Sequence, residues 1–130
     1  MKALVVYANP NPESLSGRVC QTIVETLNAK GDTVEVRDLY KLGFNPVLTA
    51  EEQAGNAQGK LMADVLEEQK HLSQADVVFF VYPIWWAGLP AIMKGWFDRV
   101  LTYGYAYRYG AKGLEKMLKG KKAVILNNHG

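Results

Sequence analysis

The sequence contains few residues of the kinds that form crosslinks or carry chemistry by themselves. It has one cysteine, Cys20, and two histidines in 130 residues. A single cysteine excludes an internal disulfide and is typical of a reducing compartment. Its histidines, cysteine and carboxylates show no metal-ligand spacing, and no Ser-His-Asp or Cys-His set is visible. The sequence therefore predicts no metal site and no activated nucleophile, so difficult chemistry would require an organic cofactor.

The chain also lacks a large excess of one charge and a long apolar run. Fifteen basic and thirteen acidic residues give a net charge of +2, which is too small to indicate a nucleic-acid or membrane surface. The apolar run in the N-terminal MKALVVYANP is broken at once by polar residues and prolines. It is too short for a signal-peptide core or a membrane span. We therefore expect a cytoplasmic protein without membrane insertion.

Short, strongly apolar runs are present at residues 3–7, 76–81 and 123–126. The first two runs predict strands buried on both faces, as in parallel sheets covered by helices, and the third predicts a further strand. Residues 33–37 alternate between polar and apolar and predict an edge strand. The chain length suits one domain. The alternation of strands and helical segments predicts an α/β fold with a mostly parallel sheet over residues 1–130.

Helical spacing of apolar residues predicts helices between these strands. The first begins after Ser14 or Ser16, and the second covers residues 51–73. The third covers residues 90–100, with Arg99 on its outward face. Residues 38–52 and the aromatic segment 103–113 are expected to be irregular, and residues 114–118 are expected to form a helical turn.

In open parallel sheets, ligands bind outside the carboxyl ends of the strands. In this chain these ends lead into residues 9–16, 83–88 and 127–130, and all three segments have unusual composition. We therefore expect them to meet at one edge of the sheet and to form a site there.

The first of these loops has neither the glycine pattern of a dinucleotide fingerprint nor the lysine of a P-loop. Instead, Ser14 and Ser16 open a helix. The free N–H groups and dipole of a helix N-terminus favour an anion. Ordinary N-capping is the alternative interpretation, and it stabilises a helix by about 1 kcal/mol.

The second loop contains the adjacent residues Trp85 and Trp86, which cannot both point into one core. Large aromatic side chains near the surface often serve in binding. A planar heterocycle held edge-on by backbone groups fits this loop, and an oligomer interface is the alternative. The aromatic segment contains four alternating tyrosines that would share one face of an extended chain: Tyr103, Tyr105, Tyr107 and Tyr109. They predict an aromatic substrate wall, a subunit contact, or both.

The stretch YPIWWAGLPAIMKGWFDRV at residues 82–100, followed by YAYRY at residues 105–109, resembles the NAD(P)H:quinone oxidoreductases of the DT-diaphorase type. Residues 8–16, ANPNPESLS, are similar to the first loop of that family. The resemblance covers essentially the whole chain. It implies a flavodoxin-like fold: a doubly wound parallel sheet in three αβα layers.

The resemblance also implies an activity. Bound FAD or FMN would be reduced by hydride from NAD(P)H and would pass two electrons to a quinone-like acceptor in a ping-pong scheme, in a homodimer. The residues implied for flavin binding are Asn9, Ser14, Leu15, Ser16, Pro83, Ile84, Trp85, Trp86, Ala87, Asn127, Asn128, His129 and Gly130. The residues implied for substrate binding are Trp86, Tyr107 and Tyr109.

The sequence departs from the family pattern in its loops and in its length. The family usually has histidine at Asn9, phenylalanine at Leu15 and asparagine at Ser16, and residues 127–130 replace a Thr-Thr-Gly-Gly-like loop. Family members continue through a further helix and strand that carry the acid–base residues, so a shortened domain is expected and no catalytic residue is assigned. The alternatives are an ancillary subunit of a transporter, such as a potassium-efflux system, and a one-electron carrier. The slightly basic charge argues against the carrier.

Overall fold

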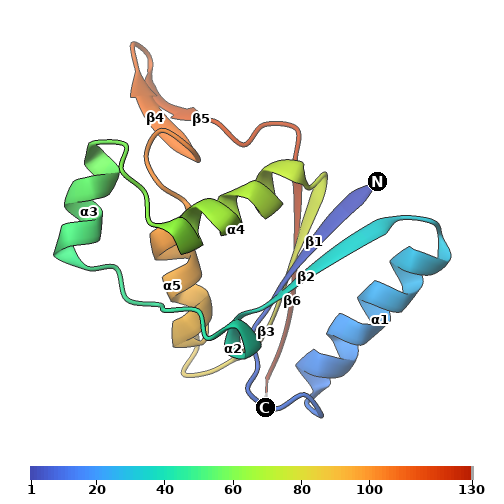
Figure 1. Cartoon of the computed structure of the whole chain (residues 1–130). Helices are drawn as coiled ribbons and strands as arrows, with labels where there is room; N and C mark the ends of the chain where they lie inside the picture. The colour runs from blue at the N-terminus through green and yellow to red at the C-terminus, as the bar shows by residue number, and fades with distance from the viewer. Residues whose placement is uncertain (130) are drawn as a thin grey trace.

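The computed structural model describes residues 1–129 and contains a four-stranded parallel sheet with helices on both faces (Figure 1). The strands are, in sheet order, β2 (Thr33–Asp38), β1 (Lys2–Tyr7), β3 (Val77–Ile84) and β6 (Lys122–His129). In the register of the sheet, Val5 of β1 lies between Val36 and Phe79. The predicted parallel α/β fold is confirmed.

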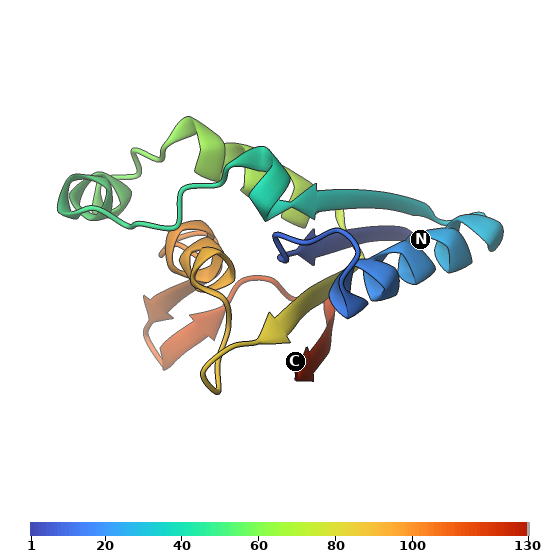
Figure 2. The ribbon, with the colours of Figure 1, turned by 90° about the horizontal axis from the view of Figure 1, so that it is seen from below.

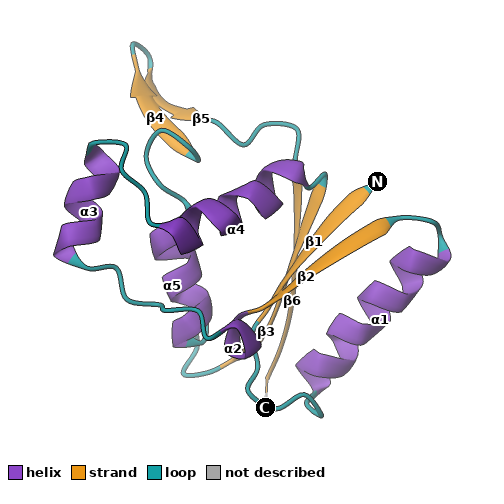
Figure 3. Cartoon of the chain, in the orientation of Figure 1, coloured by secondary structure: helices purple, strands orange, loops and turns teal. Residues whose placement is uncertain are grey.

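The helices form two layers around the sheet (Figures 2 and 3). Helix α1 (Leu15–Ala29) covers one face. The other face is covered by α2 (Leu39–Leu42), α4 (Ala63–Gln74) and α5 (Ala91–Val100). Helix α3 (Ala50–Ala57) stands at the outer side of α4 and α5 (Figure 1). A hairpin of β4 (Tyr107–Gly110) and β5 (Gly113–Lys116) follows α5.

The two faces of the central strands build two separate cores, because successive side chains of a strand point to opposite faces. Val6 contributes to the core under α4 and α5, and Val5 to the core under α1; both are fully buried. The ring of Trp96 is also fully buried and packs edge-on against Phe80 at 5.7 Å between centroids. Trp96 thus anchors α5 to the sheet.

Cys20 lies in the core under α1, and this burial predicts an unreactive thiol. Burial, with a smaller contribution from the Asp38 carboxylate, raises the pKa of Cys20 from 9.0 to about 11. At neutral pH the thiolate fraction is then roughly 100-fold lower than at the ordinary pKa, and alkylation needs the thiolate. We expect iodoacetamide to modify the native protein slowly and the guanidinium-unfolded protein rapidly, as measured by mass spectrometry. Equal rates in the two states would contradict the buried position of Cys20.

The segment before the third strand differs from the expectation of irregular chain followed by one helix over residues 51–73. Asp38 caps the short helix α2, and Gly43 ends it with a φ of 62°. The expected single helix is divided into α3 and α4. The division occurs because Gly59 adopts a φ of 75°, and the N–H of Lys60 turns back to the carbonyl of Gly55 at 2.8 Å. A left-handed glycine favours the end of a helix.

The segment after α5 also differs from the expectation. Residues 114–118 are not a helical turn, because residues 113–116 form strand β5, with Tyr109 opposite Leu114. The alternating tyrosines therefore belong partly to a strand, and a cross-strand partner stabilises that conformation. Gly113 opens β5 with a φ of 101°, a conformation that favours glycine.

Strand β6 is longer than the predicted residues 123–126. Residues 127–129 continue the strand and pair with residues 82–84 of β3, so they do not form the expected loop. Gly130 lies outside the described residues. Ile125 of this edge strand is 59% exposed. No helix among residues 1–129 combines the length and the apolar character needed to cross a bilayer.

Candidate functional site

The start of α1 and the end of β6 meet at the carboxyl edge of the sheet. The hydroxyl of Ser16 donates to Oδ1 of Asn128 at 2.8 Å. Nδ2 of Asn127 donates to the hydroxyl of Tyr82 at 3.4 Å. Because β3 pairs directly with β6, the loop that follows β3 leaves from the same edge. The structure therefore brings together the three chain segments that were expected to meet there.

The first loop, between β1 and α1, is shaped by its own side chains. Oδ1 of Asn9 accepts from the N–H of Asn11 at 2.9 Å, and Oγ of Ser14 accepts from the N–H of Gly17 at 3.1 Å. Ser14 is thus an N-cap, as the simpler interpretation proposed. The cap satisfies one of the free donors of the first turn. The N–H groups of Leu15 and Ser16 have no partner within the helix, and they can bind an anion.

Gly17 lets the first loop close tightly on α1. A Cβ at this position would lie only 2.3 Å from the carbonyl oxygen of Pro12 and 3.1 Å from the hydroxyl of Tyr7. That hydroxyl is buried and has no hydrogen-bond partner in the described part of the chain. Burial raises the pKa of Tyr7 above its ordinary value. The loop is thus held against the first turn of α1 by close packing around a glycine.

The second loop, between β3 and α5, is a tight turn with an unusual backbone. The N–H and carbonyl groups of Trp85 and Gly88 bond to each other, both at 3.1 Å. Trp86 and Ala87 have φ angles of 52° and 61°. Both lie in the left-handed region that side chains disfavour, and such strain occurs often at ligand sites. The N–H groups of Trp86 and Ala87 have no partner among residues 1–129, so the turn offers backbone donors at the edge of the sheet.

The two indole rings of the turn differ in exposure and neither is buried, in agreement with the prediction that they cannot both enter one core. The side chain of Trp86 is completely exposed, and that of Trp85 is 39% exposed. Pro83 and Ile84, also expected to line the site, are the last residues of β3 and pair with Asn128 and His129 of β6. They place the turn beside the end of β6.

Three of the four tyrosines form a cluster near the hairpin. The rings of Tyr103 and Tyr107 lie edge to face at 5.7 Å, and Tyr103 stacks with Tyr109 at 6.1 Å. The expectation that all four share one face is wrong for Tyr105. Its hydroxyl donates to the carbonyl of Gln69 at 2.8 Å, because residue 105 lies in a turn before β4 and packs on α4.

The tyrosine cluster lies far from the tryptophan turn of the same chain. The turn precedes helix α5 and the cluster follows it; ten residues of helix span about 15 Å. In Figure 1 the hairpin lies at the opposite end of the molecule from the carboxyl ends of the strands. Tyr107 and Tyr109 therefore do not line a pocket together with Trp86 of their own chain.

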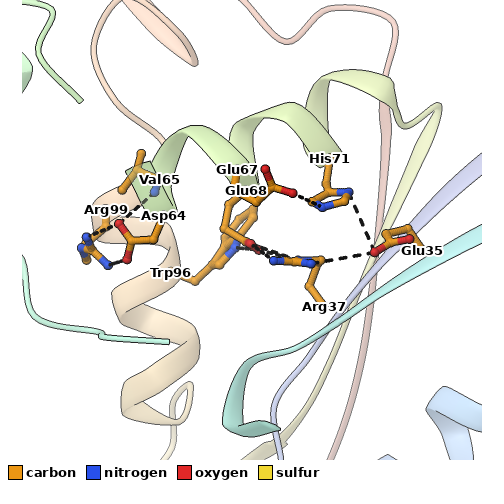
Figure 4. A network of polar contacts seen from close by, with 9 residues as sticks. All are labelled: Glu35, Arg37, Asp64, Val65, Glu67, Glu68, His71, Trp96 and Arg99. Carbon is orange, nitrogen blue, oxygen red and sulfur yellow. Dashed lines mark hydrogen bonds and ion pairs between the residues drawn. The ribbon is translucent and has the colours of Figure 1, made fainter. Parts of the chain in front are cut away.

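Arg99 was expected to point outward, but it is only 2% exposed. Figure 4 shows its guanidinium beside Asp64 of α4. Nε of Arg99 donates to both carboxylate oxygens of Glu52 at 3.0 Å, and its Nη atoms donate to Asp64 at 2.6 and 2.9 Å. Nη1 also donates to the carbonyl of Asn45 at 2.8 Å. The guanidinium stacks 5.2 Å from the centroid of the Phe44 ring.

The expectation that Arg99 faces outward is wrong, because residues 44–46, Glu52 of α3 and Asp64 of α4 cover that face of α5. Sequence periodicity gives no signal of such a cover. The same cover explains Gly95, where a Cβ would lie 2.3 Å from Pro46. The guanidinium of Arg99 lowers the pKa of Asp64, mainly through their hydrogen bonds.

A second buried carboxylate, Glu68 of α4, joins three elements (Figure 4). Glu68 is 3% exposed and accepts from Arg37 of β2 at 2.6 Å and from the indole N–H of Trp96 at 3.1 Å. A buried charge is tolerated only when it is paired and hydrogen-bonded. This network fixes the position of α5. Because the tryptophan turn leads into α5 and the tyrosine segment follows it, the network also helps to position these two segments.

Comparison with known proteins gives a family match over the whole chain. The model of a family described as having a flavodoxin-like fold matches residues 1–130. The NAD(P)H:quinone oxidoreductase of Methanothermobacter marburgensis is 40% identical and superposes with a TM-score of 0.90. That match covers 100% of this chain and 67% of the other.

Two further relatives extend the comparison. The ribosyldihydronicotinamide dehydrogenase (quinone) of Rattus norvegicus is 36% identical over 95% of this chain and 61% of its own length. General stress protein 14 of Treponema denticola, whose structure is in complex with FMN, is 29% identical. It has a TM-score of 0.68, and the match covers 100% of this chain and 63% of the other. The chain spans only 51% to 61% of the length of the curated relatives it matches.

Proposed function

Because the chain belongs to the flavodoxin-like family that includes NAD(P)H quinone dehydrogenases, we propose that it is a flavin-dependent NAD(P)H oxidoreductase acting on quinone-like acceptors. The observation that carries this proposal is the strained turn at Trp86 and Ala87, which leaves two backbone N–H groups free at the carboxyl edge of the sheet. A flavin, FAD or FMN, supplies the ability to accept a hydride and to give up two electrons.

The residues at this edge fit a flavin in two respects. The first turn of α1, with Leu15 and Ser16, offers N–H donors to a phosphate, and the dipole of the helix favours negative charge. The N–H groups of Trp86 and Ala87 are available to donate to the edge of the flavin ring, and the exposed indole of Trp86 provides a flat apolar surface. We assign the third part of the flavin site to the end of β6, which carries Asn127, Asn128 and His129.

We further propose that NAD(P)H and the acceptor bind in turn over the same ring, in a ping-pong scheme. The names of the relatives, NAD(P)H:quinone oxidoreductase and ribosyldihydronicotinamide dehydrogenase (quinone), support this choice of donor and acceptor. The role of Trp86 in this scheme is to position the ring and to shield one of its sides from water. A cytoplasmic location is part of the same proposal and agrees with the single, buried Cys20.

The proposal is tested by the absorbance spectrum and by turnover. Protein incubated with FMN or FAD and then desalted should be yellow, and it should oxidise NADH or NADPH when menadione is the acceptor. Parallel titrations with the two flavins identify the one that binds more tightly. Protein that stays colourless with both flavins refutes the proposal for this chain.

Replacing Trp86 by alanine should weaken flavin binding by roughly 10-fold, because a large apolar contact with the ring is lost, about 1.4 kcal/mol. Fluorescence titration of the flavin measures this change. The His71→Ala variant is the control. His71 of α4 lies near Glu67 of the same helix and Glu35 of β2, away from the carboxyl edge. Equal flavin affinity of the two variants would show that the ring lies elsewhere.

We also propose that the active form is a homodimer. Tyr107 and Tyr109 lie at the other end of α5 from Trp86, so they reach a flavin only if it is bound by a second copy of the chain. Tyr109 is 69% exposed and Trp86 fully exposed, and interfaces are enriched in such aromatic residues. Light scattering should give twice the monomer mass at micromolar concentration, and Tyr109→Ala should shift the mass toward the monomer. A wild-type monomer under these conditions contradicts the dimer without affecting the flavin proposal.

A further inference from the structure

The hydroxyl of Tyr7 is buried beneath the first loop, and the flavin site proposed above does not use it. Tyr7 ends β1 and is 5% exposed, and its hydroxyl has no hydrogen-bond partner among residues 1–129. Buried polar groups are nearly always hydrogen-bonded, so an unpaired hydroxyl needs an explanation. Phenylalanine would fill the same space without an unpaired group, so packing alone does not require the hydroxyl.

The Tyr7 hydroxyl lies against the first turn of α1, where Ser14 caps the helix. It would be 3.1 Å from a Cβ at Gly17, the residue whose N–H donates to Oγ of Ser14 at 3.1 Å. Burial raises the pKa of Tyr7, and the neighbouring Ser14 hydroxyl acts in the opposite direction. The Tyr7 hydroxyl is therefore a neighbour of Ser14, although no hydrogen bond joins the two groups.

The two serines of this turn differ in what they can offer to an anion. A serine hydroxyl carries one proton and two acceptor lone pairs. The proton of Ser16 is used within the protein, because its hydroxyl donates to Asn128 at 2.8 Å. Oγ of Ser14 accepts from Gly17, and its proton has no acceptor among residues 1–129. Ser14 is also partly exposed, so its hydroxyl proton and one lone pair are free for further bonds.

We propose that Tyr7 positions Ser14 for the phosphate of the flavin: the Tyr7 hydroxyl donates to the free lone pair of Ser14, and Ser14 donates its own proton to the phosphate. A small shift of Ser14 toward Tyr7 forms this bond when the anion binds at the first turn of α1. Tyr7 is a positioning residue, because it acts through Ser14 and does not touch the phosphate. The inference rests on the proposed flavin site and adds a source of its preference for a phosphorylated ligand.

Two physical effects make this arrangement favour the phosphate-bound form. Hydrogen bonds in a chain polarise one another, so donation by Tyr7 makes Ser14 a stronger donor to the anion. The phosphate-free form carries the penalty of an unpaired buried hydroxyl, and the bound form does not. Both effects are absent when the ligand has no phosphate.

The first test compares Tyr7→Phe with the wild type in binding FMN, riboflavin and inorganic phosphate. Riboflavin has the ring of FMN without the phosphate. Tyr7→Phe should bind FMN and inorganic phosphate roughly 10-fold more weakly, about 1.4 kcal/mol, and should bind riboflavin as the wild type does. Fluorescence titration measures the two flavins, and ¹⁵N NMR shifts at the amides of Leu15 and Ser16 measure inorganic phosphate.

The phosphate titration does not need the flavin ring, so it separates this inference from the proposed function. A chain that binds phosphate through Tyr7 but takes up neither flavin would refute the function and support the inference. An equal loss for FMN and riboflavin, or wild-type affinity of Tyr7→Phe for phosphate, would overturn the inference alone. Wild-type amides of Leu15 and Ser16 that do not respond to inorganic phosphate would overturn it as well.

Thermal unfolding of the flavin-free chain separates positioning from a structural role. Tyr7→Phe should unfold at or above the wild-type temperature, because it removes an unpaired buried hydroxyl. Tyr105→Phe is the matched control, since the Tyr105 hydroxyl donates to the carbonyl of Gln69 at 2.8 Å. It should unfold at a lower temperature and keep wild-type affinity for phosphate. A lower unfolding temperature for Tyr7→Phe would show that its hydroxyl is already bonded without phosphate, and would refute the proposal.

A double-mutant cycle tests the route through Ser14. Ser14→Gly removes the hydroxyl, and glycine is an acceptable N-cap residue. It should weaken phosphate binding, and adding Tyr7→Phe should cause no further loss. Ser14→Thr keeps a hydroxyl and should keep the dependence on Tyr7. An equal loss from Tyr7→Phe with Ser14 and with glycine at this position would refute the assignment.

Discussion

Replacing Arg99 by methionine is expected to lower the free energy of unfolding by about 3–5 kcal/mol, the usual cost of breaking a buried ion pair. Methionine preserves part of the volume and the contact with Phe44, but it leaves the buried carboxylate of Glu52 without its donor. The carbonyl of Asn45 loses a donor as well. The loss therefore arises mainly from an uncompensated buried charge.

Urea unfolding followed by circular dichroism measures this loss. Lys94→Met on the same helix is the matched control, because it breaks an exposed i,i+4 pair with Asp98. Such pairs contribute about 0.3–0.5 kcal/mol. A loss in Arg99→Met as small as that of the control would show that the carboxylates around Arg99 find other partners.

The ion pair between Arg99 and Asp64 predicts that stability depends on pH. Because Arg99 lowers the pKa of Asp64 in the folded chain, the unfolded chain binds more protons at acidic pH. The stabilising contribution of Asp64 is therefore fully present above its unfolded pKa, and it is lost as the pH falls through the lower folded pKa. Urea midpoints measured from pH 6 downward should fall in the wild type, and this part of the fall should be absent in Arg99→Met. Parallel pH profiles of the two proteins would contradict the coupling.

Replacing Gly17 by alanine is expected to disturb the first loop and α1 together. The new Cβ would lie 2.3 Å from the carbonyl oxygen of Pro12, which belongs to the backbone and moves only if the loop moves. Overpacking of this kind costs about 1–3 kcal/mol. Because the displaced loop leads into the donors of Leu15 and Ser16, flavin affinity should fall by at least about 10-fold.

Thermal unfolding and flavin titration measure the two consequences of Gly17→Ala separately. Gln21→Ala, one turn further along α1 on an exposed position, should change stability by no more than about 0.5 kcal/mol. If Gly17→Ala were as stable as this control, the close approach of Pro12 would have to be relieved by a shift that the loop tolerates. If it were destabilised but bound flavin normally, the first loop would not hold the phosphate.

The sheet and its three carboxyl-end segments could be predicted because their signal is local. Strands buried on both faces must be apolar at every buried position, and residues 3–7 of β1 and residues 77–84 of β3 meet this condition in the sequence. Once the parallel order is known, the meeting of Ser16 with Asn128 follows from topology alone. The tryptophan turn could be predicted as well, since two adjacent large aromatics cannot enter the same core.

The parts that could not be predicted depend on distant segments. The outward periodicity of Arg99 is correct for an isolated helix, but the loop that covers it comes from a segment about fifty positions earlier in the chain. Tyr105 leaves the common face of the tyrosines because α4 offers it a carbonyl acceptor at Gln69. The separation of Tyr107 from Trp86 follows from the direction of α5, which the order of residues alone does not define.

Helix α5 has a consequence for how related chains can vary in length. A single inserted residue in a helix turns everything after it by about 100° and moves it by 1.5 Å. An insertion inside α5 would rotate Arg99 away from Glu52 and displace the tyrosine segment relative to the tryptophan turn. We therefore expect insertions and deletions in connecting segments outside α5, where they do not change the rotation of one functional segment relative to another. Residues 58–62 between α3 and α4 are such a segment. Helix α5 thus acts as a spacer of fixed length.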